Sequence, residues 1–325
     1  MLAGMPRAAM PRHLGRRRSR PAQPQVVVLG DRMLDAVVLP MRALDTATDV
    51  PGKVVLRQGG SAATTARWVA RLGARSVLVC AVGRDRLGRA LVDTIRRDGV
   101  RVRAIHVAGT RTGRIGVVVA TDGERSFVAD RAAADRLAPA DLTGADVRGD
   151  LLHLPVYSLL GEPLGRAGRR AIELTRQGGG LVSLDLASIR PLLAHGQRAA
   201  ATLVREAAPD VLFATRAESQ ELLGGPWLSG LGDLAPLVVI KEGRAGASVL
   251  ARDGGSRFSF QVATRAIDAP DTTGAGDAFD AGFLVAWLGL PPDERNRPAG
   301  LRRAVVAANR AAGRHLASPG KELSL

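Results

Sequence analysis

Cysteine is almost absent from this chain: Cys80 is the only one in 325 residues, and it lies in the apolar run 76–82. A single cysteine excludes a disulfide framework and a cluster of thiolate metal ligands, and it is typical of a reducing cytoplasm. No apolar run approaches the length of a membrane span, and the first residues lack the apolar segment of a secretory signal. The sequence therefore predicts a cytoplasmic protein with no membrane partner.

Aromatic residues and lysines are also scarce. Phe, Trp and Tyr make up 3% of the chain, and lysine occurs only at positions 53, 241 and 321, so nearly all the positive charge is arginine. Six arginines and no acidic residue lie in residues 1–24, which are predicted to form a disordered tail rich in Arg and Pro. Despite the net charge of +15, the remainder is mixed in sign and offers few rings on which bases could stack, so no nucleic-acid partner is expected.

Apolar runs of strand length alternate with helical patterns from residue 25 onward. The run at 26–29 ends at a glycine, which is the pattern of a strand buried on both faces. A helix is predicted at 61–72 because Gly73 is a suitable C-terminal cap. Further strands are predicted at 76–82, 151–154, 181–186, 211–214 and 237–240. This alternation predicts βαβ units on a mostly parallel sheet, and the 46% hydrophobic content allows one large domain.

One predicted hairpin interrupts this alternation. Segments 112–120 and 125–129 flank a four-residue turn that contains Asp122-Gly123, a sequence that favours a tight hairpin turn. The hairpin is interpreted either as a lid over a site or as an edge hairpin that does not move.

The stretch 271–279 reads Asp-Thr-Thr-Gly-Ala-Gly-Asp-Ala-Phe and runs into an apolar segment with helical spacing. Glycines let backbone N–H groups approach a ligand, and a helix start is electropositive, so the pattern suits a phosphate. Asp277 would lie beside that anion hole as a base, the arrangement that phosphoryl transfer to a hydroxyl requires. The alternative is a capping turn with Asp277 in the first helical turn. Either way, the helix start should keep Asp277 ionised and make it a weak base.

A second candidate group follows the strand at 26–29. Asp31 and Asp35 come after its carboxyl end, where ligands bind in open α/β sheets. Asp35 is therefore a candidate for holding substrate hydroxyls, although a turn aspartate is an equal alternative.

Two motifs resemble one protein family. The first is Gly59-Gly60-Ser-Ala-Ala-Thr-Thr-Ala66, which continues to Gly83-Arg-Asp85-Arg-Leu-Gly88, and the second is the 271–279 stretch with Ala281-Gly282-Phe283. Together they resemble the PfkB or ribokinase-like carbohydrate kinases. The resemblance implies a ribokinase-like three-layer α/β/α sandwich with a central mostly parallel sheet. It also implies one kinase domain over residues 25–325, with a small β-strand lid formed by about 36–58 and 110–131.

The resemblance further implies ATP-dependent transfer of the γ-phosphoryl group to a hydroxyl of a sugar, with Mg²⁺ as cofactor and K⁺ as a possible activator. Asp277 would be the catalytic base, with the anion hole at Gly274, Ala275 and Gly276 and substrate contacts at Asp35, Gly59, Gly60 and Thr64. Glu218 would order water on Mg²⁺, and the nucleotide side would comprise Thr215, Lys241, Gly243, Gly246 and, near adenine, Asn309. Asp271 and Thr273, with backbone carbonyls near 315–320, resemble a monovalent-cation loop.

Several positions depart from the family pattern. Thr64 and Thr215 replace common asparagines, the Asp185 to Arg190 segment keeps its pattern only in part, and alanines follow Arg131 where glycine and asparagine are frequent. The catalytic end is intact whereas the substrate end differs. A nucleoside kinase on the same fold and, from a different class, a non-catalytic sugar-binding regulator are the alternatives. The lid is also a candidate surface for a homodimer.

Overall fold

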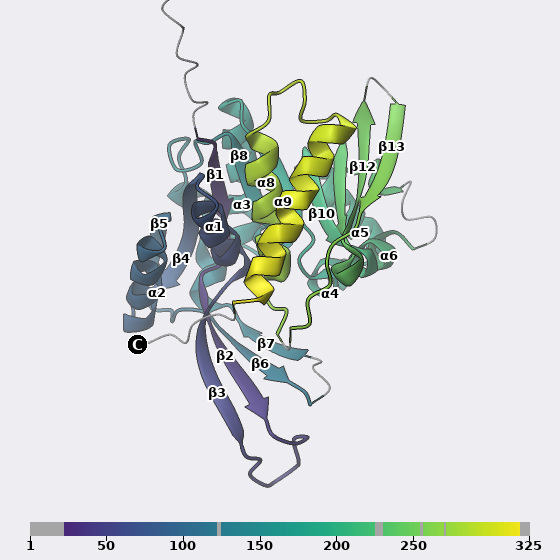
Figure 1. Cartoon of the computed structure of the whole chain (residues 1–325). Coiled ribbons are helices and arrows are strands. Elements are labelled where there is room, and N and C mark those ends of the chain that lie inside the picture. Colours follow the sequence, from purple (N-terminus) through teal and green to yellow (C-terminus); the bar gives the residue numbers. More distant parts are fainter. Residues whose placement is uncertain (1–22, 122–124, 225–229, 254–255, 270, 319–325) are drawn as a thin grey trace, which may run out of the picture.

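The computed structural model describes residues 23–121, 125–224, 230–253, 256–269 and 271–318, so the predicted tail lies outside the described residues except for its last two positions. The chain forms a large sheet between helical layers, and a small second sheet projects from one end of it (Figure 1). Among the described residues, none of the helices is both long and apolar enough to cross a membrane.

The large sheet is parallel over most of its width. Its order is β13-β12-β11-β10-β9-β8-β1-β4-β5, and only the pairs that involve β12 are antiparallel. The strands are β1 (Gln25–Leu29), β4 (Arg75–Gly83), β5 (Arg101–Val107), β8 (Leu151–Pro155), β9 (Leu181–Asp185), β10 (Val211–Thr215), β11 (Leu237–Lys241), β12 (Ala247–Asp253) and β13 (Ser256–Val262). The predicted α/β fold class is confirmed, but β5 and β13 were not predicted because their alternating exposed residues break the apolar runs.

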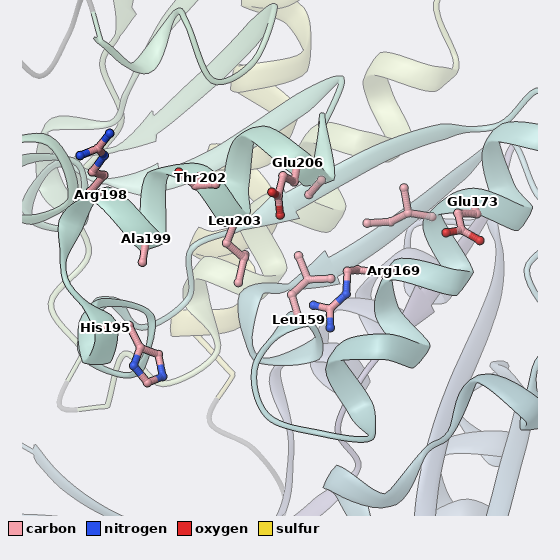
Figure 2. Close-up of a pocket in the computed structure, with 11 residues that line it drawn as sticks. Leu159, Arg169, Glu173, His195, Arg198, Ala199, Thr202, Leu203 and Glu206 are labelled. Carbon is pink, nitrogen blue, oxygen red and sulfur yellow. The ribbon is translucent and has the colours of Figure 1, made fainter.

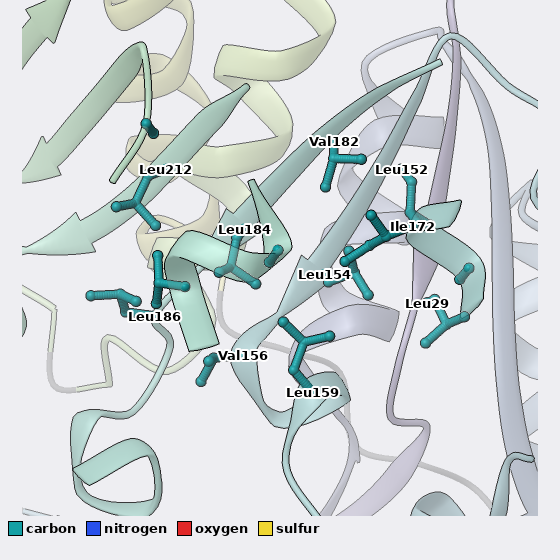
Figure 3. Packing of buried hydrophobic residues seen from close by; sticks show 14 of the residues in the cluster. Leu29, Leu152, Leu154, Val156, Leu159, Ile172, Val182, Leu184, Leu186 and Leu212 are labelled. Carbon is teal, nitrogen blue, oxygen red and sulfur yellow. The ribbon is translucent and has the colours of Figure 1, made fainter. Parts of the chain in front are cut away.

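Strand β1 explains why the sheet is covered on both faces. Val27 and Leu29 belong to one buried cluster and Val26 and Val28 to another, as the two-residue period of a strand requires. Figure 3 shows part of the first cluster, in which Leu29 of β1 lies on the same side of the sheet as Leu152 and Leu154 of the neighbouring strand β8 and as Ile172 of α3. The second cluster lies under the helices that carry the candidate site.

The helices divide between these two faces. Residues of α3 (Leu164–Gln177) and α5 (Gln197–Ala207) pack in the first cluster, and those of α1 (Ser61–Arg71), α8 (Ala275–Leu288) and α9 (Pro298–Leu316) pack in the second. The others are α2 (Arg86–Arg97), α4 (Ile189–Leu192) and α6 (Arg216–Leu223). Helices α8 and α9 lie side by side in Figure 1 because Gly282 leaves no side chain between them: a Cβ there would be 2.8 Å from the Ala308 Cα.

The small sheet has the order β3-β2-β6-β7, formed by β2 (Met33–Pro40), β3 (Gly52–Gly59), β6 (Arg114–Val119) and β7 (Arg125–Asp130). Among the described residues, most of the large exposed apolar side chains lie on it or on the β2–β3 connection; they are Met41, Leu44, Val54, Phe127 and Val128. Val306 on α9 is exposed as well, although only to 37%. Because Phe127 and Val128 are successive residues of β7, the small sheet exposes apolar side chains on both of its faces.

Candidate active site

Asp277 lies where the first turns of α1 and α8 meet. Its Oδ1 accepts a hydrogen bond of 2.6 Å from the Ser61 hydroxyl, across 216 residues of sequence. Helix α8 begins after Gly274, whose φ of +83° is a left-handed conformation suited to glycine, and no side chain among the described residues caps this helix. The Ala275 N–H donates to the Thr272 carbonyl at 3.1 Å, whereas the N–H groups of Gly276 and Asp277 have no backbone partner among the described residues and remain available to an anion beside the carboxylate.

The pKa of Asp277 is raised to about 7, mainly by burial and also by the charge of Asp185, although the Ser61 hydrogen bond and Lys241 oppose this. The residue keeps some solvent exposure, but protein atoms surround most of it. The expectation of a weak base was therefore wrong. It considered only the helix end, whereas loss of hydration has the larger effect here. A carboxylate with a pKa near 7 can accept a proton at neutral pH and is a stronger base than an exposed aspartate.

A buried ion cluster lies beside the anion hole. Lys241, at the end of β11, places its Nζ 2.8 Å from the Asp185 carboxylate and 3.3 Å from that of Asp280. Burial alone would lower the pKa of Lys241, but Asp185, Asp280 and Glu218 raise it well above its usual value. The Nζ atom is also 3.4 Å from the position that a Cβ on Gly276 would occupy. Lys241 is thus a permanent positive charge close to the glycines of the anion hole.

Glu218 and Thr215 form a capping box at the start of α6. The Thr215 N–H donates to Glu218 Oε2 at 2.7 Å, and the Glu218 N–H donates to the Thr215 hydroxyl at 3.2 Å. Burial, and then the charge of Asp185, raise the pKa of Glu218. The structure therefore places Glu218 near the Lys241 cluster, whereas the Thr215 hydroxyl is used to hold the helix start.

Asp35 of β2 and Gly59 of β3 are diagonal neighbours in the small sheet. A Cβ at Gly59 would lie 1.8 Å from Asp35 Oδ1, so the carboxylate occupies space that only a glycine leaves free. That Oδ1 atom is buried and lacks a hydrogen-bond partner among the described residues. Burial, and then the charge of Asp31, raise the pKa of Asp35 to about 7. Asp31 also raises the pKa of Asp277, so Asp31 lies within electrostatic reach of both Asp35 and Asp277.

The other predicted substrate residues are close by. Gly60 has a φ of +100°, and a Cβ there would lie 2.5 Å from the carbonyl oxygen of Asp31. Thr64 donates its hydroxyl to the Gly60 carbonyl at 3.0 Å, and its methyl group lies 3.2 Å from the Cβ position of Gly274. Thr64 thus lies at the junction of α1 and α8, and its hydroxyl is bonded to the backbone.

The predicted nucleotide-side residues occupy a turn and a helix. Gly243 and Gly246 bound the turn between β11 and β12, with φ values of +56° and +95°, and a Cβ at Gly246 would lie 2.1 Å from the Val262 carbonyl oxygen. Asn309 lies on α9, and its Nδ2 is buried without a partner among the described residues. An unpaired buried amide is a donor that a ligand could satisfy.

Two arginines from the small sheet contact the loop that precedes α8. Asp271 is paired with Arg57 of β3 and lies 3.7 Å from Arg125 of β7. Arg125 also donates to the hydroxyls of Thr272 and Thr273, each at 2.9 Å. Asp271 and Thr273, expected in a monovalent-cation loop, are therefore in contact with guanidinium groups.

Several functional side chains were not predicted from the sequence. Ser61 directly follows the double glycine, and Asp280 is a lone carboxylate in an apolar helix, so a signal existed for both. Arg57 and Arg125 had none, because arginine is abundant throughout the chain and only the fold brings them to Asp271.

A separate hollow of about 640 Å³ lies between α3 and α5 (Figure 2). Its lining combines Leu159, Ile172 and Leu203 with charged side chains such as Arg169 and Glu206. None of the predicted site residues lines it, and its helices pack in the first core cluster, whereas α1 and α8 pack in the second. The hollow is therefore distinct from the site around Asp277.

Comparison with known proteins identifies the group to which this arrangement belongs. The chain is 32% identical to a fructokinase of Klebsiella pneumoniae, over 82% of this chain and 86% of that one. It is 30% identical to a fructokinase of Salmonella typhimurium, over 83% and 87%. Among solved structures, a fructokinase from Vibrio cholerae O395 matches with a TM-score of 0.74 and 26% identity, over 92% of this chain and 94% of that one.

An adenosine kinase from Sinorhizobium meliloti matches with a TM-score of 0.79 and 24% identity, over 94% and 97% of the two chains, which shows the shared fold. Residues 23–324 match the family described as pfkB family carbohydrate kinase. With its α/β/α layers, its small second sheet and the Gly-Ala-Gly-Asp turn at the start of α8, the chain belongs to the pfkB family of carbohydrate kinases.

Proposed function

We propose that the protein is an ATP- and Mg²⁺-dependent kinase that phosphorylates a primary hydroxyl of a sugar, with fructose or a related keto-sugar as the first candidate. The observation that carries this proposal is the half-buried Asp277 carboxylate, bonded to Ser61 and placed beside the start of α8, which no side chain among the described residues caps. The fructokinases among its relatives support the substrate class. The Vibrio cholerae fructokinase, a double mutant of which was solved with fructose, ADP and potassium ion bound, supports it as well.

In the proposed reaction, the Asp35 end of the site binds the acceptor and the Asp277 end carries out the transfer. Asp35, whose Oδ1 is buried and unpaired among the described residues, holds substrate hydroxyls, and Asp277 accepts the proton of the hydroxyl that attacks phosphorus. The N–H groups at Gly274 and Gly276 stabilise charge that develops on the phosphoryl oxygens, while the Ala275 N–H is bonded to the Thr272 carbonyl, and Lys241 adds a fixed positive charge next to them. Positioning and charge stabilisation supply most of the rate in such a transfer.

We assign the nucleotide and the metal ion to the side of the Lys241 ion cluster on which Glu218 lies. Glu218 lies within electrostatic reach of Lys241 and Asp185, so a divalent cation there would lower the cost of burying these carboxylates. Bound Mg²⁺ would neutralise charge on the phosphates. The turn at Gly243 and Gly246 and the buried amide of Asn309 are proposed to contact the nucleotide. A cytoplasmic location is part of the proposal, since Cys80 is a buried free thiol.

A nucleoside kinase is the second candidate, and the fold shared with an adenosine kinase is the observation that favours it. The two are separated by measuring ADP release with ATP and Mg²⁺ over a panel of ketoses, aldoses and nucleosides. We expect turnover with a sugar and none with nucleosides. Turnover confined to nucleosides would replace the proposal, and no turnover with any acceptor would support the non-catalytic regulator instead.

Val54 and Val128, exposed apolar side chains on one face of the small sheet, support a homodimer through that face. Sedimentation velocity tests it: a dimer is expected, and a monomer at micromolar concentration would contradict it.

The activity should depend on pH through Asp277. Only the ionised carboxylate can accept a proton, and its pKa is raised to about 7, so kcat/KM should rise with pH up to about 7 and then level off. Initial rates between pH 5.5 and 9 at fixed free Mg²⁺ measure this profile, because kcat/KM reports ionisations of the free enzyme. A profile that is flat from pH 5.5 upward would show that the base ionises near its ordinary pKa.

Replacing Gly59 by alanine should weaken binding of the sugar. The new Cβ would collide with Asp35 Oδ1 and turn the carboxylate away from the acceptor. Loss of a hydrogen bond to a charged group costs about 1.5–3 kcal/mol, so KM for the sugar should rise by about 10- to 10²-fold. Gly116→Ala is the matched control on the same sheet, since its Cβ would meet only ordinary contacts with Val128. An unchanged KM in Gly59→Ala would remove Asp35 from the acceptor site.

A further inference from the structure

Within the described residues, the groups expected to bind a monovalent cation at the loop before α8 already face donors from the protein itself. The Asp271 carboxylate accepts a hydrogen bond from Arg57, lies 3.7 Å from Arg125 and accepts the Thr273 N–H at 2.9 Å. Burial alone would raise the pKa of Asp271, but the Thr273 and Arg57 hydrogen bonds and the charge of Arg125 lower it overall. Asp271 is therefore an anion already neutralised by fixed cations.

The backbone carbonyls of Thr273 and His315 each accept a hydrogen bond as well. Trp68 Nε1, which can only donate, lies 3.1 Å from His315 Nδ1, so the ring proton of His315 is on Nε2. That Nε2 lies 2.7 Å from the Thr273 carbonyl oxygen and donates to it. Burial lowers the pKa of His315, which favours this neutral form. The carbonyl of His315 in turn accepts the Ser318 N–H at 3.1 Å.

Within the described residues, the Asp271 carboxylate and the Thr273 and His315 carbonyls thus already have protein partners, which disfavours the bound K⁺ that the family resemblance implies; residues 319–320 of the expected carbonyl set lie outside the described residues. We propose that Arg57 and Arg125 replace the monovalent cation as the positive charge that holds the anion-hole loop, so that catalysis needs no such ion. This inference rests on the kinase function proposed above. The two arginines are positioning residues, because they contact Asp271, Thr272 and Thr273 but not the reacting atoms.

The position of these two arginines in the fold has a second consequence for the site. Arg57 belongs to β3 and Arg125 to β7, which are the two outer strands of the small sheet. The loop that they hold leads directly into Gly274 at the start of α8. In register, Arg57 also lies opposite Asp35 on β2. The small sheet therefore carries the acceptor carboxylate and the charges that fix the anion hole, so its docking sets both ends of the site at once.

The first test compares the enzyme in potassium, sodium and N-methylglucamine chlorides of equal ionic strength. ADP is separated and quantified directly, so that no coupling enzyme adds an ion requirement of its own. We expect kcat in the three salts to agree within about twofold, less than 0.5 kcal/mol in barrier. The temperature of unfolding, which needs no substrate, should likewise show no stabilisation specific to K⁺. Activation of about tenfold or more by K⁺, or a K⁺-specific rise in unfolding temperature, would overturn the inference.

The second test removes the charges. A double variant with Arg57→Gln and Arg125→Gln should lose about 10²-fold in kcat, because displacement of a catalytic element by about 1 Å costs that much. The Arg57→Lys and Arg125→Lys pair should recover most of that loss, which a purely steric role would not predict. Arg114→Gln, an exposed arginine of β6, is the control and should leave kcat unchanged.

If the double variant with Arg57→Gln and Arg125→Gln had the wild-type rate without K⁺, that result would contradict the inference. If this variant does not fold, the salt comparison on the wild-type enzyme provides the test. The kinase function fails separately, since it requires turnover in at least one salt. K⁺-dependent turnover would overturn only the cation replacement.

Discussion

Replacing Asp277 by asparagine is expected to lower kcat by about 10²- to 10⁴-fold, the range that a positioned general base contributes. Asparagine has the same shape, and its Oδ1 can still accept the Ser61 hydroxyl, so the helix junction should stay in place. The backbone donors at the start of α8 are unchanged, so ATP affinity measured by calorimetry should stay within about twofold. The change removes only the ability to accept a proton.

Two comparisons make this result specific. Asp93→Asn, an exposed carboxylate on α2 paired only with Arg96 among the described residues, should keep full activity.

Because the folded pKa of Asp277 is about 7 and lies above its ordinary value, wild type loses stability as pH rises towards 7, whereas Asp277→Asn does not. The variant should therefore be more stable than wild type at pH 8 and equal to it near pH 4. A fall in kcat of less than about threefold would show that the base is assigned wrongly.

Replacing Lys241 by methionine should have the largest effect on stability. Its Nζ is shared by the buried carboxylates of Asp185 and Asp280, and removing one member of a buried ion cluster costs about 3–5 kcal/mol. Both carboxylates would then have to bind protons in the folded state. The deficit should accordingly be greatest above pH 7 and shrink as pH falls, since protonation relieves the uncompensated charge.

Urea unfolding at several pH values measures this effect, and the chain offers a close control. Lys53 is an exposed lysine of β3, so Lys53→Met should change the free energy of unfolding by no more than about 0.5 kcal/mol. A loss below about 1 kcal/mol for Lys241→Met at neutral pH would mean that water or rearrangement compensates the two carboxylates.

The fold could be predicted largely from local patterns. The run at 26–29 is apolar on both faces, so it had to be a covered strand, and β1 is such a strand. The Gly274 to Asp277 turn was likewise predictable, because glycines and a first-turn carboxylate define a helix start within a few residues. The small sheet was expected, but its first strand begins at Met33, a few residues earlier than predicted.

The electrostatics of the site could not be predicted in the same way. The raised pKa of Asp277 depends on burial and on Asp185, which is 92 positions away in the numbering and comes close only through the order of the strands. The use of Thr64 and Thr215 as helix supports depends on which backbone group each hydroxyl meets. The contacts of Arg57 and Arg125 with Asp271 join segments separated by more than a hundred residues. Sequence motifs predicted the residue types of the site, whereas the fold determines their charges and partners.

The most direct test of the central proposal is ³¹P NMR of the reaction of the enzyme with ATP, Mg²⁺ and fructose. If Asp277 activates a primary hydroxyl, ATP should be converted to ADP and a new phosphate monoester, whose phosphorus signal is split by the two protons of a CH₂ group. The Asp277→Asn variant should produce that signal at a rate lower by about 10²- to 10⁴-fold. Release of inorganic phosphate alone, or no consumption of ATP with any sugar of the panel, would contradict the account.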